Sequence, residues 1–511
     1  MGVSRREFVV GAASVAALSV HGRGLWAQSA ETVNAGVVKT PLGVVRGAVI
    51  GGVRVFRGVP FAEAPVGALR FKRPVRVKPW ATERDATKFA AAAMQDGDKE
   101  FAQSEDCLYL NVWTPVEAAM GAGLPVFVWI HGGGFTGGEA FAPVLDGTEF
   151  AKAGVVVVTV AYRLGVLGFM DMGALLGEEY AGSGNNALRD LICALEWVQG
   201  NIAAFGGDAT RVTVGGESAG AKLTDILMGS VEAQGLFAQM ISESGGAERV
   251  WPRTNADAVA KGFGEVWGKD VAGLKTAAAE ELIAAQVKLL AGWPQHFPLR
   301  AEIDGELLPR LPVETIAAGS CRGKRLLIGT NREESALFIG PHPQHDATAA
   351  QLGNISLAKF QEVYAKYKTV YPEMSEERLR IRAVTAEEYW VPSVRVADAH
   401  VKGGGTAWMY RLDFAPSSGR FKGDAYHSED IGLVWDKPNV EIENAATEAV
   451  LAKQMHAAWL AFIKGETPGA VGLPVWPEYS SGARETMVLD AASRVEEKPQ
   501  EAELRLWDGV M

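Results

Sequence analysis

The sequence predicts an α/β protein with a large, mostly parallel central sheet, helices on both faces and an N-terminal β-meander. Short apolar, β-branched runs typical of buried strands recur along the chain, as at Val126–Ile130, Val155–Ala161 and Leu326–Asn331. An amphipathic helical pattern covers Ala187–Phe205. Strands that alternate with helices favour a parallel sheet covered on both sides. Earlier, Val37–Val59 alternates β-branched runs with a glycine pair, which predicts the meander.

Length and composition are those of an ordinary globular protein. The chain has 511 residues, 48% hydrophobic and 22% charged, enough for one very large core or two to three ordinary ones. Its net charge is −11 and no basic stripe occurs, so we expect no nucleic-acid partner. The three cysteines are too few for a disulfide scaffold and too far apart for a cysteine-based metal site.

The amino terminus has the features of an export signal. Arg5-Arg6 precede a moderately apolar run, Val9–Val20, which is shorter than the roughly 20 residues that a membrane-spanning helix needs. This order is typical of a signal peptide, and the arginine pair is typical of the twin-arginine type. We therefore expect residues 1–27 to be a signal peptide cleaved after Ala27, and residues 28–511 to be periplasmic or secreted in a bacterium. No other segment is long and apolar enough to span a membrane.

The central motif of the chain is a candidate nucleophile elbow. The apolar run Val212–Val214 predicts a short buried strand, and Gly216-Glu217-Ser218-Ala219-Gly220 follows it. Gly-x-Ser-x-Gly places a serine on a sharp turn from strand to helix, where only glycine fits two positions before and after it. We expect Ser218 to be a nucleophile, with the N–H of Ala219 directed at a developing oxyanion.

A glycine-rich loop supplies the other expected oxyanion donors. His131-Gly132-Gly133-Gly134-Phe135 follows the predicted strand Val126–Ile130. Three glycines after a strand let the backbone turn its N–H groups toward a neighbouring site. Because the loop precedes the serine by two strand-like runs, we expect Gly133 and Gly134 to complete the oxyanion hole.

Two long segments resemble the signatures of the type-B carboxylesterases, the family that includes the cholinesterases. They are Glu105–Trp113 and Phe205–Gly220, and a further match lies at Trp476–Tyr479. The resemblance implies one α/β-hydrolase domain over residues 28–511 and hydrolysis of small-molecule esters. It implies no metal and no organic cofactor.

The chain departs from the family in two places. The family cysteine at Cys107 commonly closes a disulfide with a partner near residues 92–95, where this chain has no cysteine, so we expect a free, buried thiol. Cholinesterases carry a choline-binding tryptophan in a long loop before this cysteine. The matching stretch here, Asp96–Gln103, is short and its only aromatic residue is Phe101.

The acid of a triad is expected after the strand Leu326–Asn331. In α/β-hydrolases the triad follows the order serine, acid, histidine. Arg332-Glu333-Glu334-Ser335 resembles the family turn Asp-Glu-Gly, whose glutamate is the acid, and this correspondence indicates Glu334. Glu333 remains the alternative, because the turn here differs at both neighbouring positions.

His427 is the expected base. It lies in a loop after the predicted strand Thr406–Leu412, in a segment that resembles the family's His-x-x-Glu, with Asp430 in place of the glutamate. The other seven histidines lie in the signal, before the acid, too close behind it, or in helical patterns, and they are His21, His131, His296, His342, His345, His400 and His456.

Together these residues predict acyl transfer to water. Ser218 attacks an ester carbonyl, His427 takes its proton, and Glu334 orients the imidazole and stabilises its cation. The resemblance also places Glu217 and Ser244 near the histidine, although both also fit plain polar positions at a turn and a strand end.

Two alternatives to ester hydrolysis stay open. In the first, the chain is a non-catalytic binding protein on this scaffold, like the adhesion members of the family, although those usually lose triad residues. In the second, the chain hydrolyses lactones, thioesters or amides with the same residues.

The arginine pair generates the first prediction. Replacing Arg5 and Arg6 with lysine should block export and leave uncleaved precursor in the cytoplasm, because the twin-arginine signal is a receptor-read address. Fractionation with an ester-hydrolysis assay measures this. Unchanged periplasmic activity would refute the twin-arginine assignment.

Overall fold

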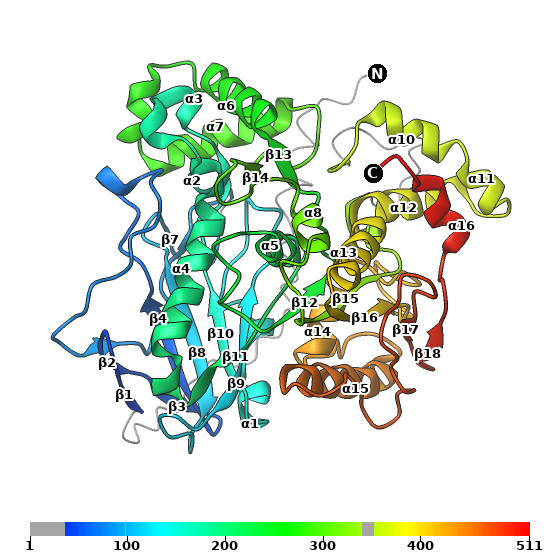
Figure 1. Ribbon diagram of the computed structural model, residues 1–511, viewed down its shortest axis with the longest axis horizontal. Coiled ribbons are helices and arrows are strands. Elements are labelled where there is room, and N and C mark those ends of the chain that lie inside the picture. Colours follow the sequence, from blue (N-terminus) through cyan, green and yellow to red (C-terminus); the bar gives the residue numbers. More distant parts are fainter. Residues whose placement is uncertain (1–35, 98, 340–351) are drawn as a thin grey trace. The chain divides into compact units, whose positions relative to one another are not determined.

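A computed structural model describes residues 36–97, 99–339 and 352–511. The expected signal peptide, residues 1–27, lies outside the described residues. The chain divides into two compact units: the first comprises the chain up to Val212 together with Ala256–Ala291, and the second comprises Thr213–Asn255 and Gly292–Met511 (Figure 1). The single domain expected for residues 28–511 stays a prediction.

The sheet of the first unit is mixed. β9 (Leu124–Ile130) and β10 (Val156–Val160) are parallel, and β10 then pairs antiparallel with β8 (Tyr109–Pro115). Beyond β8 lie β4 (Val53–Pro60) and β3 (Ala48–Ile50), both antiparallel. Every residue of β10 is buried, which explains its continuous apolar run.

The N-terminal meander divides between two sheets. β1 (Val37–Thr40) and β2 (Gly43–Arg46) form one antiparallel pair, which β5 (Arg84–Asp85) extends. β3 and β4 form another pair in the larger sheet. Gly47 joins the two pairs, and a Cβ there would lie 2.5 Å from the carbonyl oxygen of Val55, so only glycine allows the chain to pass so close.

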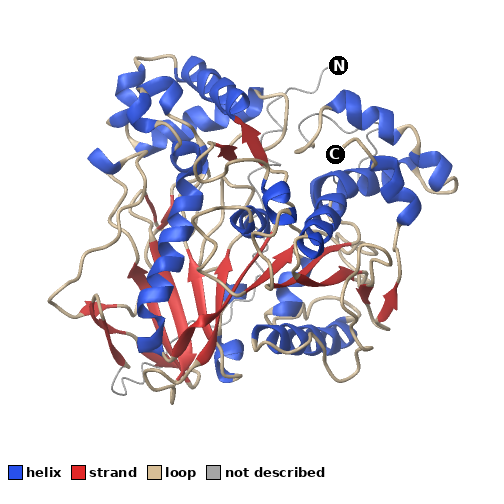
Figure 2. Ribbon diagram, in the orientation of Figure 1, coloured by secondary structure: helices blue, strands red, loops and turns tan. Residues whose placement is uncertain are grey.

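The sheet of the second unit is nearly all parallel. Its order is β11 (Gly207–Glu217, which begins in the first unit), β12 (Gln239–Glu243), β15 (Arg325–Asn331), β16 (Thr406–Leu412) and β17 (Thr486–Leu489). Only the edge strand β18 (Arg494–Glu496) is antiparallel (Figure 2). The carboxyl ends of the parallel strands therefore meet at one edge of the sheet.

Helices of the second unit lie on both sides of its strands, as predicted. Figure 1 shows α13 (Val391–Lys402) and α15 (Ala445–Ile463) on opposite sides of β15 and β16. α5 (Ala219–Met228) packs on β12, and α14 (Glu429–Val434) on α15. α12 (Glu376–Thr385) runs through a π-helical turn, Ala386–Trp390, directly into α13.

Two sequence-based expectations need correction. The elbow strand is longer than Val212–Val214, because β11 starts at Gly207. The amphipathic helix expected over Ala187–Phe205 is α4 (Asn186–Asn201) followed by a 3-10 turn, and only Glu196, Gln199 and Gly200 of α4 are not buried. Some of its polar residues are paired inside the protein, as when buried Asp190 accepts a 2.7 Å hydrogen bond from Arg163, so these residues do not mark a solvent-facing side.

Among the described residues, no helix combines the length and the apolar composition needed to cross a membrane.

The environments of the three cysteines generate a second prediction. Cys107, Cys193 and Cys321 are all free and buried, which confirms the expectation for Cys107. Burial raises the pKa of the Cys107 thiol far above its ordinary value and that of Cys193 to about 12. Because the thiolate is the reactive form, the native protein should resist alkylation, whereas the denatured protein should take up three alkyl groups by intact mass. Fewer than three would contradict the assignment of free thiols.

Candidate active site

Ser218 occupies a strained turn between β11 and α5. Its φ is +57°, a left-handed value that is unusual for a residue other than glycine. Its backbone N–H donates to the carbonyl of Glu243 at 2.9 Å, and its own carbonyl accepts from the N–H of Lys222 at 2.9 Å. The neighbouring strand and the first turn of the helix thus hold the strained backbone in place. Ser218 is only half-buried, unlike the residues on either side of it.

His427 joins the serine to an acid. Its Nε2 lies 2.8 Å from the Ser218 hydroxyl oxygen, and its Nδ1 lies 2.6 Å from Oε2 of Glu334. Since an ionised carboxylate can only accept, Nδ1 carries the proton in this pair and Nε2 is left to accept from the serine. The loop between β16 and α14 carries His427, whose backbone N–H donates to the carbonyl of Glu334 at 3.2 Å.

The carboxylate of Glu334 is fixed from its far side. Its Oε1 accepts hydrogen bonds from the backbone N–H of Asn331 at 2.7 Å and from the hydroxyl of Ser244. The side chain is completely buried. With one oxygen held by two donors, the other oxygen is directed at the imidazole.

Glu333, the alternative acid, faces elsewhere. Its carboxylate accepts from the backbone N–H of Ala425 at 3.1 Å and from Nε of Arg332 at 2.6 Å, and it pairs with Arg378 at 3.4 Å. Glu333 thus binds the segment that leads to His427. Of the two glutamates, the one that contacts the imidazole is Glu334.

Further buried carboxylates surround the imidazole. Oε1 of Glu217 lies 3.2 Å from Nε2 of His427 and accepts from the Ser428 hydroxyl at 2.6 Å. Asp430 accepts from the Tyr410 hydroxyl at 2.7 Å and from the side chain of Asn331 at 3.2 Å. Burial raises the pKa of Glu217 to about 7 and that of Asp430 to about 6.

This environment favours a charged imidazole. Burial by itself lowers the pKa of His427, but the carboxylates of Glu217 and Glu334 more than offset it, so the pKa is raised above its ordinary value. Two aromatic rings cover the imidazole, with centroids 4.7 Å away for Tyr389 and 5.2 Å for Phe338. An imidazole between carboxylates and rings is suited to receive a proton from Ser218 and to hold it.

The backbone of the glycine loop in the first unit adopts conformations that require glycine, as predicted. Gly133 and Gly134 have φ values of +112° and +62°, and a Cβ at Gly133 would lie 2.0 Å from the carbonyl oxygen of Gly137. His131 stacks on Tyr162 at 4.5 Å, and the Tyr162 hydroxyl donates to the His131 carbonyl at 2.8 Å. That the glycine loop forms an oxyanion hole together with Ala219 stays a prediction.

Several neighbours of the site were not found from the sequence. Asn331, Tyr389 and Phe338 contact His427 or its acid, yet none belongs to a motif that we used. The only available signal was the position of Asn331 at the end of a predicted strand. Two excluded histidines are accounted for: His400 in α13 contacts the Lys324 carbonyl at 3.1 Å, and His456 in α15 contacts that of Val434 at 2.8 Å. His21, His342 and His345 lie outside the described residues.

Among the described residues, we find no group of three or more His, Cys, Asp or Glu side chains arranged to hold a metal ion.

Comparison with known proteins gives consistent matches. The model of the carboxylesterase family matches residues 34–507. The para-nitrobenzyl esterase of Bacillus subtilis is 34% identical over 91% of this chain and 96% of its own, and the fumonisin B1 esterase of Sphingopyxis macrogoltabida is 33% identical over 86% and 84%. Among solved structures, a carboxylesterase of Geobacillus stearothermophilus is 35% identical, with a TM-score of 0.82 over 92% of this chain and 99% of its own. A para-nitrobenzyl esterase structure has the same TM-score at 34% identity. These neighbours have the α/β-hydrolase fold, which is the fold predicted for this chain.

The contact between Glu217 and His427 generates a third prediction. A histidine that accepts the serine proton must be neutral, so kcat/KM should fall as the pH drops through its raised pKa. Replacing Glu217 with glutamine removes a carboxylate that raises this pKa and should shift the acid limb down by about one pH unit. Because Glu217 and His427 interact, the apparent pKa of the acid limb in the wild-type protein describes the two groups together.

Glu333→Gln is the matched control, since Glu333 does not contact His427, and its acid limb should stay at the wild-type position. An unmoved limb in Glu217→Gln, or a shift to higher pH, would contradict the electrostatic role of Glu217.

Proposed function

Because the chain belongs to the carboxylesterase family and is a carboxylic ester hydrolase, we propose that it cleaves small-molecule esters through Ser218, His427 and Glu334. The observation that carries this proposal is the pair of hydrogen bonds made by one imidazole, 2.8 Å to the serine and 2.6 Å to the glutamate. A protein that only binds a ligand has no need of such a buried relay, so the pair also argues against a purely binding role.

In the first half of the proposed reaction, Oγ of Ser218 attacks the ester carbonyl carbon as Nε2 of His427 takes its proton. The carbonyl oxygen becomes an oxyanion, which the backbone N–H groups of Gly133, Gly134 and Ala219 would stabilise; one such donor is typically worth about 2.7–4 kcal/mol. The intermediate then collapses, the C–O bond to the alcohol breaks, and His427 returns the proton to the leaving alcohol. An acyl ester on Ser218 remains.

In the second half, water attacks the acyl-enzyme. His427 takes a proton from the water, and the second tetrahedral intermediate expels the Ser218 oxygen, which recovers the proton. The Glu334 carboxylate stabilises the imidazolium at Nδ1. Glu217, near Nε2, adds a second negative neighbour, and Ser244 acts by holding Glu334.

We also propose the location and organisation of the protein from its sequence. Residues 1–27 would direct export to the periplasm or the medium, and residues 28–511 would form one α/β-hydrolase domain from the two compact units. The family match from residue 34 onward is consistent with a mature chain that starts shortly before it.

The relay generates the fourth prediction. Ser218→Ala and His427→Ala should each lower kcat for an activated ester by several orders of magnitude, on the order of the 10⁶-fold loss in a comparable serine hydrolase. Neither substitution adds bulk, so both variants should stay folded by circular dichroism. A folded His427→Ala variant with near wild-type turnover would mean that another group is the base.

The two adjacent glutamates offer a matched pair within this test. Glu334→Gln should lower kcat by about 10⁴-fold, because the amide no longer stabilises the imidazolium and can favour the wrong tautomer. Glu333→Gln removes the same charge one residue away and should cost far less. The reverse order would transfer the role of acid to Glu333.

The fifth prediction concerns the charge of the alcohol. Phe101, the only aromatic residue of the stretch Asp96–Gln103, packs edge-on against Phe141 at 5.6 Å, and Phe141 stacks on Phe89 at 5.1 Å. A phenylalanine engaged in such a cluster is a weak platform for a quaternary ammonium group. The chain should therefore show a higher kcat/KM for an uncharged butyrate ester than for butyrylcholine. A clear preference for the choline ester would contradict this and require another cation site.

A further inference from the structure

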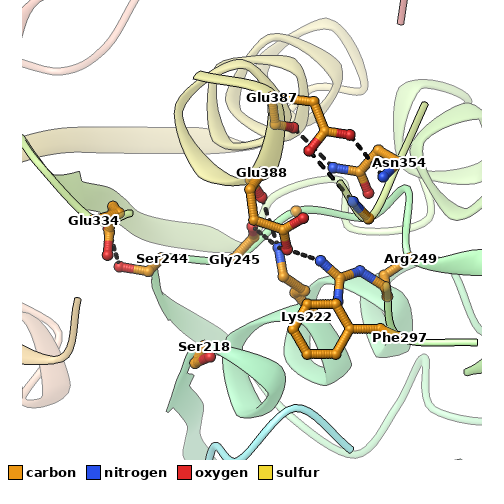
Figure 3. A network of polar contacts seen from close by, with 12 residues as sticks. Ser218, Lys222, Ser244, Gly245, Arg249, Phe297, Glu334, Asn354, Glu387 and Glu388 are labelled. Atoms are coloured by element: carbon orange, nitrogen blue, oxygen red, sulfur yellow. Dashed lines mark hydrogen bonds and ion pairs between the residues drawn. The ribbon is translucent and has the colours of Figure 1, made fainter. Parts of the chain in front are cut away.

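A buried lysine lies one helical turn beyond the nucleophile. Lys222 is on α5, only 3% exposed, and its backbone N–H donates to the carbonyl of Ser218. Its side chain runs away from the serine into a buried polar cluster that also contains Arg249, Glu387 and Glu388 (Figure 3). The mechanism above gives this cation no part, although burying it carries a large desolvation cost.

The ammonium group is bonded to two separate segments. Nζ donates to the carbonyl oxygens of Gly245 and Glu388, both at 2.9 Å, and lies 3.4 Å from a carboxylate oxygen of Glu388. It also lies 4.8 Å from the centre of the Tyr389 ring. Two of the three possible donors of this side chain thus go to backbone carbonyls, and the Glu388 carboxylate lies within ion-pair distance.

The first segment is the turn that supports the acid. Gly245 follows Ser244, which has a φ of +60° and donates its hydroxyl to Glu334. The turn is tightly enclosed, since a Cβ at Gly245 would lie 2.1 Å from the Ser242 hydroxyl and 2.3 Å from Asp225. A displacement of the Gly245 peptide is therefore transmitted to Ser244 and to the carboxylate that it holds.

Helix α5 holds this turn from two positions, one that donates hydrogen bonds and one that accepts them. Lys222 takes the Gly245 carbonyl, whereas Asp225, three residues further along the same helix, accepts from the N–H of Gly246 at 2.7 Å and from the Ser242 hydroxyl at 2.9 Å. The lysine donates to a carbonyl and the aspartate accepts from an N–H, so the two side chains hold both sides of the same turn. The helix that begins at the nucleophile is in this way bonded to the turn behind the acid.

The second segment covers the base. Glu388 and Tyr389 belong to the π-helical turn Ala386–Trp390, and the Tyr389 ring lies 4.7 Å from that of His427. π-Helical turns often occur at functional sites because they reposition side chains. The bond from Lys222 to the Glu388 carbonyl fixes the peptide group that directly precedes this tyrosine.

We propose that Lys222 is a positioning residue of the esterase: it ties the nucleophile helix to the Ser244 turn that orients Glu334 and to the Tyr389 segment that covers His427. This inference rests on the proposed function, and it concerns alignment of the three groups relative to one another. The charged groups that face Lys222 are Arg249, Glu248, Asp225, Glu387 and Glu388.

Lys222→Met tests the proposal, since methionine keeps an unbranched side chain without the ammonium. Misalignment of a reacting group by about 1 Å can cost about 100-fold in rate, so kcat should fall about 10–100-fold with little change in KM for an uncharged ester. If Glu334 is displaced from Nδ1, the imidazolium loses its partner, the pKa of His427 falls, and the acid limb of kcat/KM should move to lower pH by about half a unit or more.

Arg249→Met is the matched control. Arg249 pairs with the same Glu388 carboxylate and stacks on Phe297 at 4.0 Å, at the side of the cluster away from the Ser244 hydroxyl and Glu334. Both variants lose a buried cation, so both should lower the melting temperature. Only Lys222→Met should move the acid limb.

Lys222→Met with Glu388→Gln is the second variant, because it removes one charge of each sign from the cluster and leaves Arg249 with Glu387 as a neighbouring carboxylate. It should show the same loss of kcat and the same shift. A folded single or double variant with wild-type kcat and an unmoved acid limb would overturn the proposal. Ser218→Ala, assayed in parallel, separates the two claims: an inactive Ser218→Ala beside a normal Lys222→Met refutes the positioning role alone, whereas an active Ser218→Ala refutes the proposed function.

Discussion

The hydrogen bond between Nδ1 of His427 and Glu334 is the contact on which the site depends. Both groups are buried, and a buried carboxylate is costly unless donors surround it. Here Ser244 and the Asn331 N–H hold one oxygen while the imidazole holds the other. In the proposed reaction a positive charge appears on the imidazole as the proton arrives. In a medium of low dielectric constant, fixed carboxylates next to that charge stabilise it more strongly than water would, and they need no rearrangement to do so.

The parallel sheet of the second unit explains how distant residues come together. Glu217 at the end of β11 is opposite Glu243 of β12, and Glu243 is opposite Gly329 of β15. Ser218 and Ser244, the next residues of the first two strands, therefore emerge side by side, and the loop after β15 delivers Glu334 to the same edge. This edge is where the crevices of α/β proteins generally form. The positive φ of both serines follows, because each chain must turn sharply as it leaves the sheet.

The sequence predicted the parts of the site that local patterns encode. Ser218 belongs to a motif whose glycines are dictated by one turn, and β15 and β16 have continuous apolar runs that mark buried strands. Glu334 and Glu333 stayed open, because the choice depends on which carboxylate faces a loop far along the chain. The contact of Glu334 with the imidazole separates them, since Glu333 is bonded to Arg332 and Ala425 instead. The polar side of α4 was misjudged because the pattern cannot tell a solvated charge from one paired inside. For the same reason, the sequence pattern could not distinguish the buried Lys222 from a solvent-exposed lysine on a helix.

Direct observation of the covalent intermediate tests the central claim most directly. Wild-type protein mixed with an excess of an activated ester, quenched in acid within milliseconds and digested, should carry one acyl group per chain on the peptide that contains Ser218. The adduct should disappear once the ester is consumed, and Ser218→Ala should carry none. Turnover without any acylated chain, or an acyl group on another residue, would contradict a mechanism in which Ser218, activated by His427 and Glu334, is the nucleophile.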